Sequence, residues 1–334
     1  MEHNVDNDKH AVSKEFPELF HYTNLSAFKN IYESRKFRAT HYEDLNDSTE
    51  FIRFRLKVLE FIRPMIWGIF NERIQCDDEV AKDISEQGGI DAVVDKEAEW
   101  SLERVHSHTF NKNMYKETFI CSFCAHKQSY ESTHGLLSQW RGYGADGGVA
   151  IVLATYNIQE MMQREYDVFQ YQIMYMGDVI YDTIDNNMRI KSDFRDVFEY
   201  YPKALKALYS VEELYNKKKL ALCFKEMHNH FVLGSTLVKH QAFREENEIR
   251  IVASPMTNDS YSYYPDPKRP KEILYKQLNN REACYIELFG EARLPIKRII
   301  VGPSRIQNVN YQTTKDIAKN QGIEVVKSEI PFNS

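Results

Sequence analysis

Residues 140–153 read WRGYGADGGVAIVL, and this stretch decides between two fold classes. Gly142, Gly144 and Gly147 have the G-x-G-x-x-G spacing of a dinucleotide-binding turn. In a Rossmann unit that spacing follows a strand and opens a helix, so that helix amides face the pyrophosphate. Here it precedes an apolar run, Val149–Leu153, which predicts a buried strand. We therefore interpret the glycines as a turn that leads into a strand, and we assign no Rossmann site.

Other apolar runs predict further strands on both sides of this one. They lie at 16–23, 36–40, 118–124, 171–181, 249–253, 283–288, 297–301 and 324–328. Helical spacing is found behind Asn24, a candidate N-cap, and at 157–168, 193–231 and 313–320. Strands and helices do not follow a strict βαβ order. The prediction is an α+β fold with a mixed or antiparallel sheet and helical insertions.

The polar segment Met1–Glu15 is predicted to be a flexible tail. We interpret residues 16–334 as a single α+β domain with helical insertions at about 64–116 and 186–232. Pro64 is expected to end or kink the helix before it, since proline removes a helical hydrogen bond.

Composition limits the class of protein. Lys and Arg number 43 against 49 Asp and Glu, a net charge of −6 that argues against sequence-independent duplex binding. No apolar run has the roughly 20 residues of a membrane helix, and the first residues contain no signal core. Five cysteines are too few for a disulfide framework. We predict a soluble cytoplasmic protein without a membrane segment.

Two patterns suggest metal sites. Cys121 and Cys124, with His126 and His134 nearby, resemble a zinc ligand set. Residues three apart in a strand lie on opposite faces, however, and buried free cysteines are common. No metal is therefore predicted.

The second metal pattern is a possible divalent-metal nuclease or hydrolase site at Asn46, Asp47 and Glu50. Asp47 followed by Glu50 matches a capping box, so we interpret Asp47 as a helix N-cap and Asn46 as a turn residue.

The segment 243–252 has a pattern that favours a binding site. As a strand it would place Glu246, Glu248 and Arg250 on one face, with Ile249 and Ile251 on the other. Clustered carboxylates beside an arginine form a rigid polar row and occur at sites that bind ligands. An exposed sheet face would give the same pattern, so both interpretations stay open.

Several motifs together resemble a bacterial family catalogued as domain of unknown function 2971. They occur in the same order along most of the chain: His21-Tyr22-Thr23, Leu45–Glu50, Cys121-Ser122, Trp140-x-x-Tyr143-Gly144, Lys239 with Phe243-x-x-Glu246-x-Glu248-x-Arg250, Ile299–Pro303 and Ser328–Phe332. Phe243 stands where that family usually has Trp.

The layout also resembles ADP-ribosyltransferases, in which a strand His-x-Thr precedes a helix and a late strand carries Glu-x-Glu. This resemblance implies a split sheet and the binding of NAD as a substrate, without a metal. It implies Glu248 as the catalytic carboxylate, Glu246 as the group that orients the acceptor, and His21 as the anchor of NAD. The implied cofactor-binding residues are His21, Tyr22, Thr23, Tyr143 and Arg250, with Tyr143 or Tyr22 stacking on nicotinamide.

The implied function is transfer of ADP-ribose to a protein or nucleic-acid acceptor, in a bacterial toxin or a phage-defence effector. The alternative is a non-catalytic binding module, in which the Glu and Arg row forms buried salt bridges and 140–148 recognises a partner. The two differ in a geometric expectation. An enzyme requires His21, Glu246 and Glu248 to face one cleft.

Overall fold

The computed structural model describes residues 11–45, 50–111, 116–144, 147–209, 213–256, 268–278 and 281–331. The chain divides into two compact units. Unit 1 comprises Met1–Leu45, Thr118–Val179 and Ala242–Ser334, and unit 2 comprises Asn46–Glu117 and Ile180–Gln241. The single domain at 16–334, with its two insertions, stays a prediction.

Unit 1 contains a ten-stranded mixed sheet with the order β12-β11-β4-β1-β3-β2-β10-β9, in which β8 also pairs with β3 and β5 pairs with β8. The strands are β1 (Glu18–Thr23), β2 (Lys36–His41), β3 (Phe119–Cys124), β4 (Val149–Ala154), β5 (Tyr171–Asp178), β8 (Glu248–Pro255), β9 (Leu274–Leu278), β10 (Arg281–Phe289), β11 (Ile296–Val301) and β12 (Glu324–Lys327). The neighbours β11 and β12 are parallel, and the other pairs are antiparallel. The structure confirms a mixed α and β fold with a mixed, open sheet, while the likeness of this sheet to that of ADP-ribosyltransferases stays a prediction.

The sheet splits at β3. One edge of β3 pairs with β8 along its whole length. The other edge is shared, because β1 pairs with Cys124 at one end and β2 pairs with Phe119 and Ile120 at the other. The strand β1 therefore leaves β3 after a single pair, and β2 takes its place.

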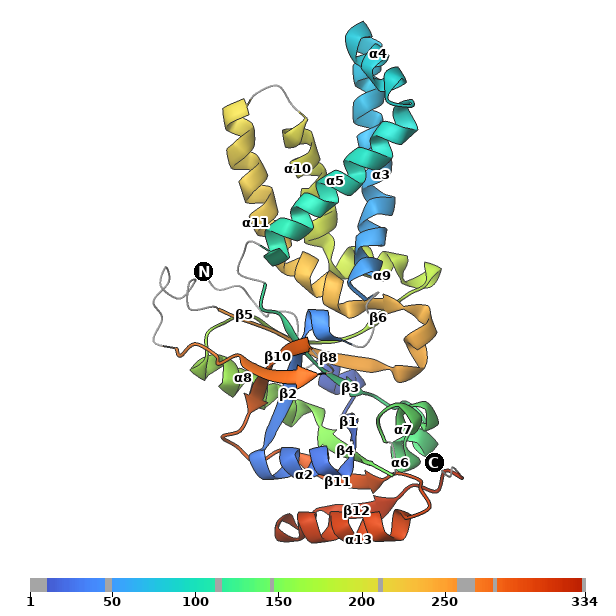
Figure 1. Ribbon diagram of the computed structural model, residues 1–334, viewed down its shortest axis with the longest axis vertical. Coiled ribbons are helices and arrows are strands. Elements are labelled where there is room, and N and C mark those ends of the chain that lie inside the picture. Colours follow the sequence, from blue (N-terminus) through green and yellow to red (C-terminus); the bar gives the residue numbers. More distant parts are fainter. Residues whose placement is uncertain are drawn as a thin grey trace. The chain divides into compact units, whose positions relative to one another are not determined.

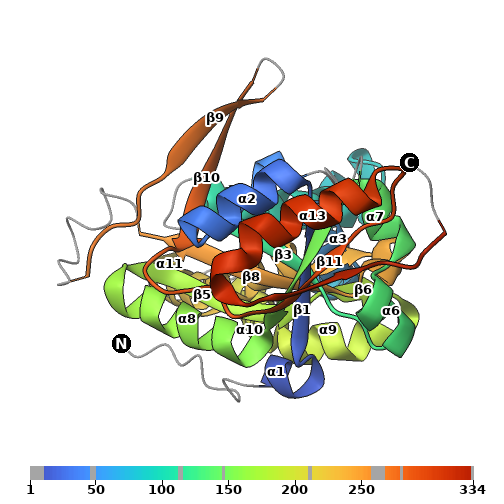
Figure 2. The ribbon, with the colours of Figure 1, turned by 90° about the horizontal axis from the view of Figure 1, so that it is seen from below.

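Helices cover both faces of this sheet. The larger apolar core lies under α2 (Leu25–Ser34), α8 (Thr155–Val168) and α13 (Gln307–Ala318), and α2 runs beside α13 (Figure 2). A smaller core on the other face contains Phe20, Tyr22, Cys124 and Trp140, the last from α7 (Leu137–Tyr143). We call these the α2 face and the α7 face.

Unit 2 is mainly helical (Figure 1). Its elements are α3 (Glu50–Cys76), α4 (Asp78–Glu86), α5 (Ile90–His106), α9 (Asn187–Asp193), α10 (Arg195–Leu208), α11 (Glu213–Leu237) and the parallel strands β6 (Ile180–Asp182) and β7 (Val238–His240). Pro64 does not end its helix, since α3 continues through it to Cys76. No helix in the described ranges is both long enough and apolar enough to cross a membrane.

Two segments predicted to be irregular are helical. Ala11–Glu15 form α1 within the predicted flexible tail, while residues 1–10 lie outside the described residues. The segment before β4, interpreted as loop and turn, contains α6 (Ser129–His134) and α7. The side chain of Trp140 explains α7, because it is 2 % exposed and anchors the helix against the sheet.

Candidate functional site

A buried ion pair lies at the start of β8. Arg250 Nε is 2.7 Å from Glu248 Oε1, and its terminal Nη2 is 3.0 Å from Oε2, a bidentate arrangement. Both residues are buried, with Glu248 6 % and Arg250 2 % exposed. The central position of β8, between β3 and β5, holds the backbone beneath this pair rigid. A carboxylate with one fixed orientation is the result.

The predicted strand begins later than expected, and Glu246 is not part of it. Glu246 ends a 3-10 helix, Gln241–Glu246, and Asn247 has a left-handed backbone with φ of 41°. The chain turns there before β8 starts at Glu248. The row of Glu246, Glu248 and Arg250 on one strand face is therefore wrong for Glu246 and correct for the other two.

Tyr22 lies on the face of the sheet that Glu248 occupies. Phe20 is opposite Cys124 in the pairing of β1 with β3, and Cys124 is opposite Glu248. Directly opposed residues share a face, and so do residues two apart on one strand. Tyr22, Glu248 and Arg250 therefore project to the α7 face.

The Tyr22 hydroxyl lies in a short hydrogen-bond chain. It donates to His126 Nε2 at 2.6 Å and accepts the Leu136 amide at 2.9 Å. The His126 side chain is fully buried, and burial lowers the pKa of His126 to about 4. Because His126 is neutral, its Nε2 accepts the hydrogen bond from the Tyr22 hydroxyl, which keeps its proton. The pair ties β1 to the segment that leads into α7.

Tyr175 is a residue on this face that sequence reasoning missed. It lies opposite Val252, two positions from Arg250 on β8, and its side chain is 37 % exposed. Gly177, opposite Arg250, leaves room for the Tyr175 ring, since a Cβ there would lie 2.5 Å from that ring. An exposed aromatic ring beside a buried ion pair is suited to stacking on a planar ligand. Tyr175 is exposed within a strand that is otherwise mostly buried. This exposure depends on which residues surround it in the fold, and the local sequence does not indicate it.

His21 projects to the opposite, α2 face. It pairs with Ile151 of the α2-face core, and its ring lies between Phe37 and Phe123, at centroid distances of 5.1 and 5.7 Å. The imidazole donates Nδ1–H to the Ser122 carbonyl at 3.3 Å, where β1 leaves β3. Burial lowers the pKa of His21 to about 4. The structure therefore does not bring His21 to the face of Glu248, and the expectation that His21 and Glu248 face one cleft is wrong.

The remaining predicted residues divide between the two faces. Thr23 is two positions from His21 on β1, is 9 % exposed and projects to the α2 face. Tyr143 ends α7 and is 46 % exposed.

Trp140 of the same helix makes an edge contact with Tyr22, with the ring centroids 4.7 Å apart. Cβ atoms at Gly144 and Gly302 would each lie within 2.9 Å of this indole, so the Trp-x-x-Tyr-Gly motif is explained by the packing of Trp140.

The cysteine prediction is confirmed in its geometry. Cys121 belongs to the α2-face core and Cys124 to the α7-face core. The two thiols thus lack the shared face that a common zinc ion needs. Burial raises the pKa of Cys121 to about 12, which makes this thiol a poor ligand and nucleophile. Asn46 and Asp47 lie outside the described residues, and their structural roles stay predictions.

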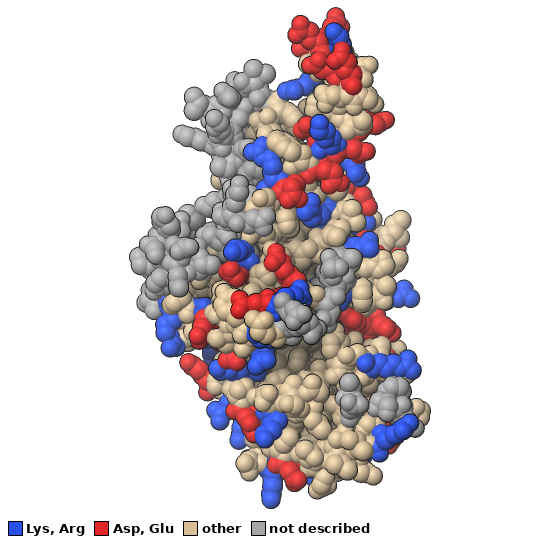
Figure 3. Space-filling model, in the orientation of Figure 1, with Lys and Arg blue, Asp and Glu red and all other residues tan. Residues whose placement is uncertain are grey.

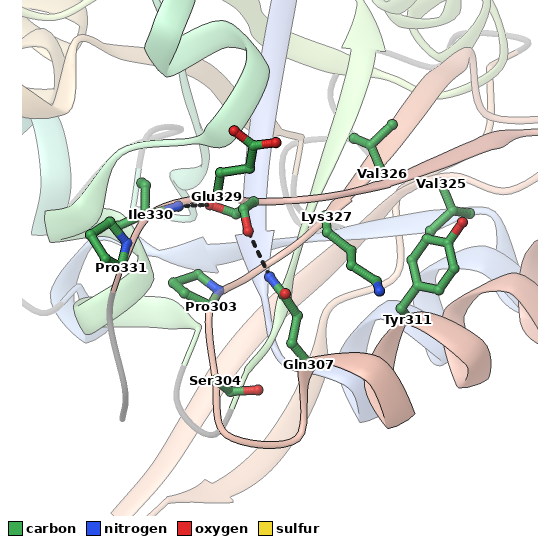
Figure 4. Close-up of a pocket in the computed structure, with 11 residues that line it drawn as sticks. Pro303, Ser304, Gln307, Tyr311, Val325, Val326, Lys327, Glu329, Ile330 and Pro331 are labelled. Carbon is green, nitrogen blue, oxygen red and sulfur yellow. Dashed lines mark hydrogen bonds between the residues drawn. The ribbon is translucent and has the colours of Figure 1, made fainter.

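A pocket of about 810 Å³ lies at the C-terminal ends of β11 and β12 (Figure 4). Gln307 of α13 joins the two strand ends, since its Nε2 donates to Ser328 O at 2.8 Å and to Val301 O at 3.3 Å. The pocket is lined by Pro303, Ser304, Gln307, Tyr311 and the consecutive residues 325–331. Sequence reasoning noted 299–303 and 328–332 as motifs without assigning them a site.

Comparison with known proteins gives one match. Residues 139–251 match the model of a family described as a protein of unknown function (DUF2971). The matched range contains Trp140, Tyr143 and the segment from Phe243 to Arg250, so the chain is similar to this family in that part. No curated protein and no solved structure matches the chain.

Proposed function

We propose that the protein is an ADP-ribosyltransferase-like enzyme that uses NAD and transfers ADP-ribose to a macromolecular acceptor. The observation that carries the proposal is the Glu248 carboxylate, fixed by Arg250 on the same sheet face as the exposed ring of Tyr175. Glu248 and Tyr175 share a sheet face, and the Tyr175 ring lies against Gly177, the residue opposite Arg250. Cleavage of a glycosidic bond uses a carboxylate of fixed orientation, and an aromatic ring on the same face can stack on a planar leaving group.

The chemistry assigns one role to Glu248. Breaking the bond between nicotinamide and ribose develops positive charge on the ribose, as in glycoside hydrolysis. A preorganised carboxylate near that ribose stabilises the charge without a metal ion. The bond between ribose and nicotinamide breaks, and neutral nicotinamide leaves with the bonding electrons. An acceptor oxygen or nitrogen forms the new bond to ribose and releases its proton to solvent.

The other residues take roles that follow from their faces. Arg250 is a positioning residue, because its guanidinium holds both oxygens of Glu248. Tyr175 is proposed to stack on NAD, in place of the buried Tyr22. His21 is reassigned from the anchor of NAD to a structural residue at the split of the sheet, since it projects to the other face. The proposal for Glu246 as the group that orients the acceptor remains, with the residue placed on the turn before β8.

A second candidate function is a non-catalytic binding module. The observation in its favour is that Glu248 and Arg250 are both buried and bound to each other, as that alternative predicts. A buried ion pair of this kind is also found as a purely structural feature.

Kinetics of Glu248→Gln test the first proposal. The amide keeps its hydrogen-bonding capacity and loses the charge, so turnover of NAD should fall by about 10²-fold or more. The affinity for NAD should change little, because the carboxylate acts chiefly in the transition state. Tyr175→Leu should give the opposite pattern, weaker NAD binding with a smaller effect on turnover.

Three controls separate chemistry from folding. Glu245→Gln changes an exposed neighbour of the same type, and Tyr156→Leu changes a tyrosine on α8 that is more exposed than Tyr175. Both should leave NAD turnover within about twofold of wild type. Glu248→Gln strands the Arg250 charge, at a cost of about 3–5 kcal/mol. The double variant Glu248→Gln with Arg250→Gln removes that charge and should recover stability but not turnover. Recovery of turnover would contradict the role of Glu248.

A further inference from the structure

The pocket at β11 and β12 follows the free edge of the sheet. The strand β12 is the last in the sheet order, and within the described part of the chain it pairs with β11 alone. The Ser328 amide donates to Val301 O at 2.9 Å, which turns the backbone groups of Val326 and Ser328 toward β11. By alternation, the amides and carbonyls of Val325 and Lys327 point away from β11, and both residues line the pocket.

The shape of the pocket suits an extended chain. One wall consists of the consecutive residues 325–331, and the other comes from Gln307 and Tyr311, which are one turn apart on α13 (Figure 4). An unpaired strand edge that faces a helix accepts a peptide as an added strand, with main-chain hydrogen bonds for affinity and side-chain pockets for specificity. The four residues of β12 span about 13 Å, the length of about four residues of such a peptide.

Two lysines lie beside the Tyr311 ring, and one of them, Lys327, lines the pocket. Lys327 Nζ lies 4.8 Å from the centre of the Tyr311 ring, and Lys315 Nζ lies 5.3 Å from it. Lys327 also donates to Asn308 Oδ1 at 2.6 Å. Among the residues that the structure describes, neither lysine has a carboxylate at ion-pair distance, so their charges remain uncompensated by the protein.

The acidic residue of this wall does not balance them. The carboxylate of Glu329 is 3.8 Å from His134 Nε2, and the Glu329 amide donates to His134 Nδ1 at 3.2 Å. Figure 4 shows the side chains of Glu329 and Lys327 pointing in different directions. The charge next to Tyr311 therefore stays positive.

We propose that this groove binds an extended acidic peptide of a partner protein. The peptide adds to the free edge of β12 as a strand, and an acidic side chain lies between Lys315 and Lys327 at the Tyr311 ring. The carboxylate of the peptide supplies the negative partner for the two lysines. The backbone of the peptide pairs with the outward amide and carbonyl groups of Val325 and Lys327. This interaction does not depend on the NAD chemistry proposed above.

Fluorescence polarisation with a labelled peptide tests the proposal on the intact protein. The probe is acetyl-Val-Glu-Val-Glu-Val-amide, in which alternate side chains are acidic, so that one face of the added strand is anionic. Two probes of equal length serve as comparisons, one with lysine in place of glutamate and one with N-methylated backbone amides. We expect the acidic probe to bind at least tenfold more tightly than either.

Charge reversal on the protein locates the site. Lys327→Glu and Lys315→Glu should each weaken binding of the acidic probe at least tenfold and improve binding of the basic probe. Lys319→Glu changes an exposed lysine that follows the C-terminal end of α13, and it should change binding less than twofold. Because all three positions are at the surface, these variants should unfold at the wild-type temperature, and thermal unfolding checks this.

Each alternative occupant gives a different result. If the N-methylated probe bound as tightly as the acidic probe, strand addition would be wrong. Binding would then depend only on the carboxylates and not on backbone hydrogen bonds. Competition by inorganic phosphate at the same concentration as the peptide would point to a small-anion site and contradict the proposal. Self-association of the protein that Lys327→Glu abolishes would identify a second copy of the chain as the occupant, and would likewise overturn it.

Discussion

His21 and His126 are two imidazoles that the fold holds in the neutral form. Each has a pKa of about 4 because of burial, against 6.5 for the exposed group. The unfolded chain therefore binds protons more readily below pH 6.5, and the stability that each neutral ring contributes is lost as the pH falls toward 4. The free energy of unfolding should decline over this window by about 1.4 kcal/mol per pH unit for each histidine.

The variant His21→Phe tests this at one residue. Phenylalanine fits between Phe37 and Phe123 and does not titrate, so the slope of stability against pH should fall by about 1.4 kcal/mol per pH unit between pH 6 and 4.5. Urea unfolding at a series of pH values measures it. Glu18 does not interfere, because the hydrogen bonds from Arg298 hold its pKa at about 2, and its contribution is lost only as the pH falls from 4.5 to about 2. An unchanged slope would show that His21 is accessible to protons in the folded protein.

The same residues show why the candidate site was only partly predictable. Alternation along β1 was visible in the sequence, but which of His21 and Tyr22 shares a face with Glu248 depends on the pairing of β1 with β3 through Phe20 and Cys124. The pairing of Glu248 with Arg250 required only local strand geometry and was predictable. The exposure of Tyr175 depends on its neighbours in space, and nothing in the local sequence indicates it.

At the scale of elements, the N-cap of α2 is a prediction that the structure confirms. Asn24 has an extended backbone, and its Oδ1 accepts the Ala27 amide at 2.8 Å. Asn24→Ala should lower the free energy of unfolding by about 0.5–2 kcal/mol, whereas Asn24→Asp should keep the cap. Lys29→Ala, on the exposed side of the same helix, should stay within about 0.5 kcal/mol of wild type. A loss for Asn24→Asp as large as for Asn24→Ala would contradict a capping role.

Strands were predicted better than the helices next to glycine. The runs at β3, β4 and β11 are short, apolar and bounded by polar residues, so local pattern and final structure agree. The serines and glycines in α6 and α7 favoured a turn in the sequence. Both segments are helical in the structure, where Trp140 of α7 is buried against the sheet. Tertiary packing overrides local preference there.

At the scale of the whole molecule, charge is unevenly distributed. Between Asp77 and Arg104 there are ten acidic and three basic residues, a net charge of −7 that exceeds the −6 of the chain. Acidic side chains gather over α4 (Figure 3). This segment of unit 2 therefore repels a phosphate backbone.

The central claim is NAD chemistry at Glu248, and release of nicotinamide tests it most directly. The intact protein is incubated with NAD labelled in the adenosine part, with and without bacterial cell extract, and free nicotinamide and the label in protein and nucleic-acid fractions are measured. We expect release of nicotinamide and transfer of label to one of the two fractions when extract is present. Folded protein that neither releases nicotinamide nor transfers label, and that shows no heat of NAD binding by calorimetry, would contradict the claim and favour a non-catalytic binding module.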